Sequence, residues 1–159
     1  MNKSKDEIIQ DFRSLGCEEP ERWTESEFSD DECAQLAAYR FLRPLQSSLD
    51  IYSQQYQTWI QNIESSNHQN KLSRILKKMI EAGIKPKEIG YFAYQIASQA
   101  YNEVLNRIED PTGGDFDLNH QGKVLPSWVL MELKDEEERE FTGRIIAGLN
   151  EQFPLRHME

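Results

Sequence analysis

Cysteine is scarce in this 159-residue sequence, which contains only Cys17 and Cys33. Two cysteines are too few for the disulfide framework of a small secreted protein, and these two lack the paired spacing of a structural zinc site. We therefore predict that both are reduced thiols, which is typical of a cytosolic protein.

Long hydrophobic runs are also missing. The opening residues, MNKSKDEIIQDF, contain no apolar run long enough for a signal peptide. No stretch approaches the roughly 20 apolar residues that a helix needs to span a bilayer. We therefore expect a cytoplasmic protein that has no membrane partner.

Acidic residues outnumber basic ones: the sequence contains 28 Asp and Glu but only 18 Lys and Arg. The formal net charge is therefore −10. A net negative charge favours solubility and disfavours unspecific binding to nucleic acid or to anionic lipid. If the protein has a macromolecular partner, the charge therefore favours a protein with a basic surface.

One segment starts like a calcium-binding loop but does not continue as one. In DFDLNHQG, the residues Asp115, Asp117 and Asn119 occupy the first, third and fifth ligand positions. The sixth position requires glycine for a sharp turn and holds His120, and the twelfth requires a bidentate glutamate and holds Pro126. We therefore predict a polar surface turn that does not bind calcium.

Catalytic signatures are absent from the sequence: it has no nucleophile elbow, no P-loop and no glycine pattern for dinucleotides. His68, His120 and His157 fall in predicted turns or in the C-terminal tail, and none forms a His-x₃-His pair. We therefore predict no metal and no cofactor, and we favour a protein without enzymatic activity. An enzyme that brings distant carboxylates together in space is the alternative.

Helical periodicity is the main positive signal. Ser4 and Glu7 have the spacing of a capping box, and Gly16 follows the first apolar pattern as a stop signal. We expect residues 17–28 to form an acidic connector, and we expect Pro44 to kink or end the second helix. The predicted helices cover about 5–15, 29–43, 45–64, 71–82 and 86–109, with a last helix before Pro154.

The predicted fold class is mainly α. A chain of this length can bury roughly 70% of its unfolded surface, so one core is feasible. We expect a single domain of residues 1–159, built as a bundle of about five helices, with room for a short extended segment near 124–134. Residues 128–133, WVLMEL, fit a short strand or the start of a helix equally well.

The predicted helix 71–82 has two contrasting sides, since four basic residues fall opposite an apolar stripe. Clustered Lys and Arg can bind phosphate groups, which makes nucleic-acid binding through residues 71–87 a weaker alternative function. The other interpretation, which we prefer, is a face that is solvated or paired with the protein's own acidic segments. The basic face consists of Lys71, Arg74, Lys77 and Lys78.

The predicted helix 86–109 has a broad apolar side and a strip of neutral amides. We expect Phe92, Ile96, Ala100 and Val104 to be fully buried in the core. The amides and nearby aromatic residues would then either satisfy one another between helices or line a groove for a partner or ligand. The candidate groove residues are Tyr52, Tyr56, Trp59, Tyr94, Gln95, Gln99, Tyr101, Asn102 and Asn106.

The segments WVLMEL and GRIIAGLNE, at residues 128–133 and 143–151, resemble the C-terminal part of some small uncharacterised bacterial proteins. The resemblance covers under a quarter of the chain; it implies a bacterial origin and brings no activity with it. Our leading hypothesis is a non-enzymatic interaction protein, for which an immunity or inhibitor protein is one concrete form. A helical small-molecule binder or enzyme with a Tyr/Gln/Asn-lined cleft is the alternative, and the sequence leaves the oligomeric state open.

Overall fold

The computed structural model describes residues 3–29, 32–65, 71–110, 128–135, 137 and 139–155. Within these ranges the chain is mainly helical, as the sequence predicts, and the short extended segment that the sequence allows for is part of an antiparallel hairpin that follows the longest helix. The elements are α1 (Lys5–Ser14), α2 (Pro20–Ser29), α3 (Gln35–Ser53), α4 (Tyr56–Ser65), α5 (Lys71–Glu81), α6 (Pro86–Glu109), β1 (Met131–Asp135), β2 (Glu140–Ile145) and α7 (Leu149–Gln152).

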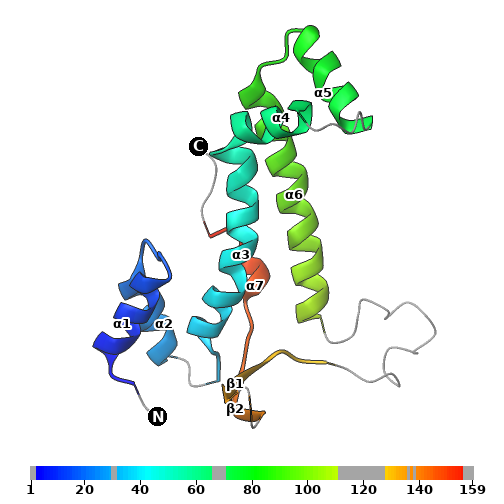
Figure 1. Cartoon of the computed structure of the whole chain (residues 1–159). Helices are drawn as coiled ribbons and strands as arrows, with labels where there is room; N and C mark the ends of the chain where they lie inside the picture. Colours follow the sequence, from blue (N-terminus) through cyan, green and yellow to red (C-terminus); the bar gives the residue numbers. More distant parts are fainter. Residues whose placement is uncertain are drawn as a thin grey trace, which may run out of the picture.

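Two long helices, α3 and α6, lie side by side and form the long axis of an elongated molecule (Figure 1). Helices α4 and α5 sit at one end of this pair, and α1 and α2 lie beside the other end of α3. The hairpin lies below the lower end of the pair, and α7 returns from it to pack against α6. One side of α6 is therefore covered by α3, and among the described residues no second long helix covers its other side.

Several helix ends lie where local chemistry places them. Ser4 and Glu7 form the predicted capping box, in which the backbone N–H of Ser4 donates to the Glu7 carboxylate at 2.7 Å. Gly83 follows α5 with a φ of +86°, a left-handed conformation that ends the helix at low cost. Pro86 occupies the first turn of α6, where its missing N–H has no helical partner to lose.

Three predictions about helices are wrong. The expected acidic connector 17–28 contains α2, whose Trp23 packs edge-on against Tyr39 with the ring centroids 5.0 Å apart. Helix α3 begins after Ala34, so the second helix starts later than the expected residue 29. Pro44 does not end α3, because it lies on the exposed side of the helix while the buried side, with Leu42 and Leu49, holds the helix against α6.

In the described part of the chain, the core consists of three apolar clusters. A small cluster joins α1 to α3 through Ile8, Phe12 and Tyr39, and another joins α4, α5 and α6 through Ile60, Leu76 and Ile89. The main cluster lies between α3, α6 and the C-terminal segment. It contains Ala38, Leu42, Leu49, Tyr94, Leu105, Leu149 and Phe153.

The C-terminal region differs from the single helix that we expect before Pro154. Strands β1 and β2 pair antiparallel, with Met131 opposite Ile145 and Leu133 opposite Phe141, so this part of the WVLMEL segment is a strand. Arg144 ties the hairpin to the helices, since its guanidinium donates to the Glu27 carboxylate at 2.6 Å and to the carbonyl oxygen of Cys33. A short helix, α7, follows this hairpin.

A carboxylate from α6 accepts hydrogen bonds at the N-terminus of α7. The backbone N–H groups of Leu149 and Asn150 donate to the two oxygens of Glu109, at 2.6 and 3.0 Å. A carboxylate at this position satisfies N–H groups that have no partner within the helix. The lower end of α6 is therefore fixed to the C-terminal segment.

Among the described residues, none of the helices combines the length and the apolar character that crossing a membrane requires.

Candidate functional site

Helix α6 presents apolar residues to two sides. Tyr94 and Leu105 face α3 and are only 4% and 1% exposed. The prediction that Phe92, Ile96, Ala100 and Val104 are buried is wrong: Phe92 is 60%, Ile96 55% and Val104 56% exposed, and Ala100 is exposed as well. The apolar arc of α6 is wider than the side that α3 covers, and the uncovered part faces outward.

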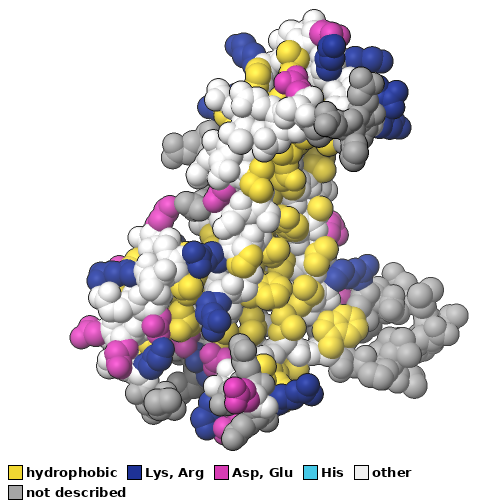
Figure 2. Space-filling view, in the orientation of Figure 1, with side chains coloured by type: hydrophobic (Ala, Val, Ile, Leu, Met, Phe, Trp, Pro, Cys, Tyr) yellow, Lys and Arg dark blue, Asp and Glu magenta, His cyan; other side chains and the backbone are white. Residues whose placement is uncertain are grey.

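The exposed residues form a continuous surface, which we call the α6 apolar face and define as Phe92, Ile96, Ala100, Val104 and Trp128. Its four helical residues are spaced by four, so they form one ridge along α6. Figure 2 shows hydrophobic side chains in a column along α3 and α6, continuing towards the hairpin end. The face is therefore a long stripe rather than an isolated exposed residue.

Trp128 extends this face at its lower end. Its indole N–H donates to the backbone carbonyl of Ile108 at 2.9 Å, which holds the ring against α6. Together with Val104 and Ile108 it lines a shallow groove of about 460 Å³, which is also lined by Glu103 and Arg107. The lining of the groove therefore combines apolar and charged side chains, as protein interfaces do.

The α6 apolar face has the size of the largest apolar patch on a typical monomer, and such a patch is often functional. At about half exposure, its five side chains present on the order of 500 Å² of apolar surface, while the largest patch on a typical monomer is roughly 300–600 Å² and is often functional. Keeping this surface in water has a cost of about 25 cal/mol per Å² relative to burying it. The face is therefore a candidate binding surface.

The aromatic candidates from the sequence lie in separate places. Tyr52 and Trp59 pack edge-on at the α3–α4 junction, with a centroid distance of 5.0 Å, and Tyr56 lies against Gly90 of α6. Tyr94 belongs to the main core cluster, and Tyr101 contacts the ring of Phe153 at 5.9 Å. These rings are mainly part of the packing and do not form one groove.

The amide strip of α6 is also divided. Gln95 and Gln99 are exposed, so the prediction that they face another part of the protein is wrong. Asn106 accepts a hydrogen bond from the side chain of Asn150 in α7 at 2.6 Å. Asn102 is half-buried, and its side-chain oxygen has no hydrogen-bond partner among the described residues. Any role of these amides in binding stays a prediction.

The basic residues of α5 lie on the surface. Lys71, Arg74, Lys77 and Lys78 are all exposed, and Leu76 on the opposite side is buried. Lys77 is 4.0 Å from Glu81 on the same helix, a weak surface pair. The basic face thus faces solvent as the sequence predicts, and binding of nucleic acid through it stays a prediction.

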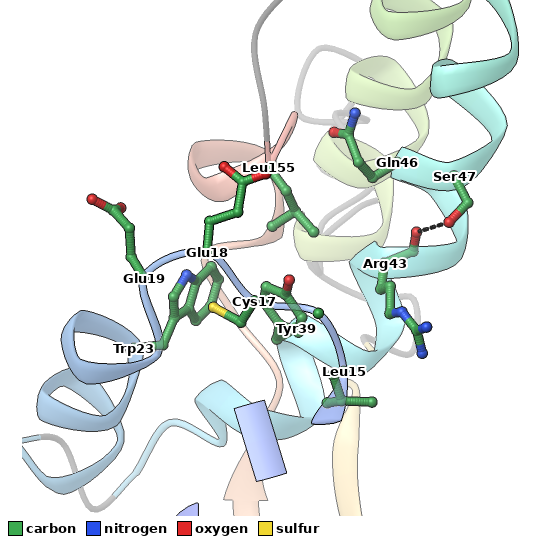
Figure 3. A pocket seen from close by; sticks show the side chains of 11 residues that line it. Leu15, Cys17, Glu18, Glu19, Trp23, Tyr39, Arg43, Gln46, Ser47 and Leu155 are labelled. Atoms are coloured by element: carbon green, nitrogen blue, oxygen red, sulfur yellow. Dashed lines mark hydrogen bonds between the residues drawn. The ribbon is translucent and has the colours of Figure 1, made fainter. Parts of the chain in front are cut away.

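A second cavity, of about 280 Å³, lies where the α1–α2 connection meets α3 and Leu155 (Figure 3). Trp23 and Tyr39 supply aromatic surface, and Arg43 and Gln46 supply hydrogen-bond donors. Gln46 is already bonded to Asp50 at 2.9 Å. Burial raises the pKa of the Cys17 thiol in this cavity above its ordinary value, so the thiolate needed for nucleophilic attack is a minor species at neutral pH.

Within the part of the chain that the structure describes, no group of three or more His, Cys, Asp and Glu side chains could hold a metal ion. The calcium-like segment from Asp115 to Pro126 and the three histidines, His68, His120 and His157, lie outside the described residues.

Comparison with known proteins adds no assignment, because no protein-family model, curated protein or solved structure is significantly similar to this chain. The four helical residues of the α6 apolar face are those that we expect, from the sequence, to lie in the core. The sequence does contain one sign that part of this helix stays exposed, which is the width of its apolar arc. The arc has Phe92 at one edge and Tyr94 and Leu105 at the other. One neighbouring helix covers only part of so wide an arc.

Proposed function

We propose that this protein is a non-enzymatic interaction protein and that its α6 apolar face binds another protein chain. The observation that carries the proposal is the exposed ridge of Phe92, Ile96 and Val104 on a helix whose other side is anchored in the core. Large apolar side chains on a rigid helix gain free energy when a partner removes them from water.

The shape of the surface supports a protein partner more than a small molecule. Small ligands bind in concave pockets that enclose most of their surface, whereas the α6 apolar face is an open ridge with one shallow groove. Phe92 and Trp128 are the aromatic anchors of the face. Aromatic residues are enriched in protein interfaces and carry much of their binding energy.

The net charge of −10 favours one concrete form of this function, an immunity or inhibitor protein for a basic partner. Complementary charge accelerates the encounter of two proteins. In this form, the acidic surface outside the α6 apolar face guides association with the basic partner.

The test is photo-crosslinking inside cells of the native source. Benzoylphenylalanine replaces Ile96 in the α6 apolar face or, as the control, Gln10, which is exposed on α1. We expect ultraviolet light to produce a protein adduct from position 96 and none from position 10. No adduct at position 96, or equal adducts at both positions, would contradict the proposal.

A further inference from the structure

We infer that the partner of the α6 apolar face is a second copy of this chain, bound with the two α6 helices antiparallel about a two-fold axis on the exposed side of α6, level with residue 98 and midway between Ile96 and Ala100. The inference rests on the proposed function, because it names the chain that this protein-binding face takes. Closed dimers with two-fold symmetry are the commonest oligomers, and their interface joins one surface patch to itself.

The ridge on α6 is complementary to itself in this arrangement. A two-fold axis near residue 98 places Ile96 of one copy opposite Ala100 of the other, so a large side chain meets a small one. Ridges of residues spaced by four interdigitate in the commonest class of helix packing. The short side chain of Ala100 lets the two helices approach closely at this point.

The same axis pairs a protruding residue with a groove. Phe92 and Val104 lie six residues on either side of position 98, which is about 9 Å along the helix in each direction. Phe92, which is 60% exposed, therefore faces the shallow groove that Val104, Ile108 and Trp128 form on the second copy. Each copy contributes one such ring and one such groove, as a two-fold interface requires.

The charge pattern of α6 favours a second copy in particular. Near a two-fold axis each residue faces its own equivalent, so a charge at the centre would oppose the same charge on the other copy. Residues 89–102 contain no Lys, Arg, Asp or Glu, although 29% of the whole chain is charged. The first charges beyond this stretch are Glu88 and Glu103, at its two ends.

The apolar area matches what such a dimer needs. A stable interface of standard size takes about 800 Å² from each partner, and a little more than half of it is nonpolar. The α6 apolar face supplies on the order of 500 Å² of apolar surface, which is enough for the nonpolar part of such an interface on one partner. The net negative surfaces outside α6 remain available in the dimer for a basic partner.

The first test measures the mass of the full chain by analytical ultracentrifugation at roughly 20 µM, a concentration that populates a micromolar dimer. We expect twice the 18.6 kDa of the chain. Ile96→Glu should raise the dimer dissociation constant at least about 100-fold, because it puts a carboxylate at the apolar centre of the interface. Phe92→Ala, which removes the ring from the groove, should weaken the dimer in the same direction.

The matched control is Phe141→Glu. Phe141 lies on β2 and is 56% exposed, against 55% for Ile96, so the two substitutions remove similar apolar surface and add the same charge. We expect Phe141→Glu to remain a dimer, and unchanged circular dichroism should show that both variants are folded. A monomeric wild-type chain, or equal weakening by both substitutions, would overturn the inference.

The second test measures orientation by disulfide formation. Gln99→Cys lies next to the proposed axis, whereas two copies of Arg107→Cys would lie about 27 Å apart along the helices. Oxidation should therefore crosslink Gln99→Cys and leave Arg107→Cys unlinked, with the wild-type chain as the control for Cys17 and Cys33. Crosslinking of both variants would indicate parallel helices and overturn the antiparallel arrangement.

The outcomes separate this inference from the proposed function. A monomeric chain whose position 96 still forms an adduct with a different protein in cells would overturn the dimer and leave the proposed function in place. A monomeric chain that forms no adduct would contradict both.

Discussion

The two apolar faces of α6 are built from similar residues and meet different surroundings. The inner face, with Tyr94 and Leu105, lies against α3 and the C-terminal segment. The outer face, with Phe92, Ile96 and Val104, has comparable hydrophobicity and is more than half exposed. The difference shows that an apolar helix face is evidence for a contact, and that the contact can be inside the chain or with another chain.

The inner face should show the largest effect on stability. Leu105 is 1% exposed within the main cluster, so Leu105→Ala removes buried methyl groups and leaves a cavity. We expect a loss of about 2–5 kcal/mol in the free energy of unfolding, measured by urea denaturation. Val104→Ala, on the outer face of the same turn, should change it by less than about 0.5 kcal/mol when both variants are made in the Ile96→Glu background, where association does not contribute. Similar losses for both variants would remove the distinction between the faces.

A smaller effect is expected where α6 crosses the α3–α4 junction. A Cβ atom at Gly90 would lie 2.5 Å from the backbone oxygen of Tyr52 and 2.6 Å from the Cβ of Tyr56. Gly90→Ala therefore forces the helices apart, and we expect it to destabilise the protein by about 1–3 kcal/mol in the same urea assay, despite the higher helix propensity of alanine. Unchanged stability would show that α6 does not pass this junction so closely.

The sequence predicts well what local chemistry decides. The capping box of Ser4, the stop at Gly83 and the start of α6 at Pro86 each depend on a few neighbouring residues. The fold class follows from the same periodicity. These features could be derived without knowing how the helices pack.

Features that depend on packing could not be derived. Helix α2 is short and highly charged, and Trp23 stabilises it by contact with Phe12 and Tyr39, which no local pattern reveals. The continuity of α3 through Pro44 depends on the contacts of its buried side with α6. For the candidate site, periodicity gives the width of the apolar arc on α6, and only the position of α3 decides which part of it stays exposed.

The amide strip gives a prediction of almost no effect. The sequence-based hypothesis of a structural strip expects Gln99→Ala to leave a partner unsatisfied and to cost about 1–3 kcal/mol. Because Gln99 is exposed, we now expect a change in unfolding free energy of less than about 0.5 kcal/mol. A clear loss of stability in thermal or urea denaturation would show that its amide has a structural partner.

The central claim is that α6 has one buried and one exposed apolar face. Its most direct test compares the unfolding free energies of Phe92→Ala and Leu105→Ala. Both substitutions are made in the Ile96→Glu background, so that association does not contribute to the measured stability. We predict that Leu105→Ala loses about 2–5 kcal/mol, whereas Phe92→Ala changes stability by less than about 0.5 kcal/mol, because its ring is 60% exposed. A loss of about 3–5 kcal/mol for Phe92→Ala, the usual range for a core phenylalanine, would place this ring in the core and contradict the account.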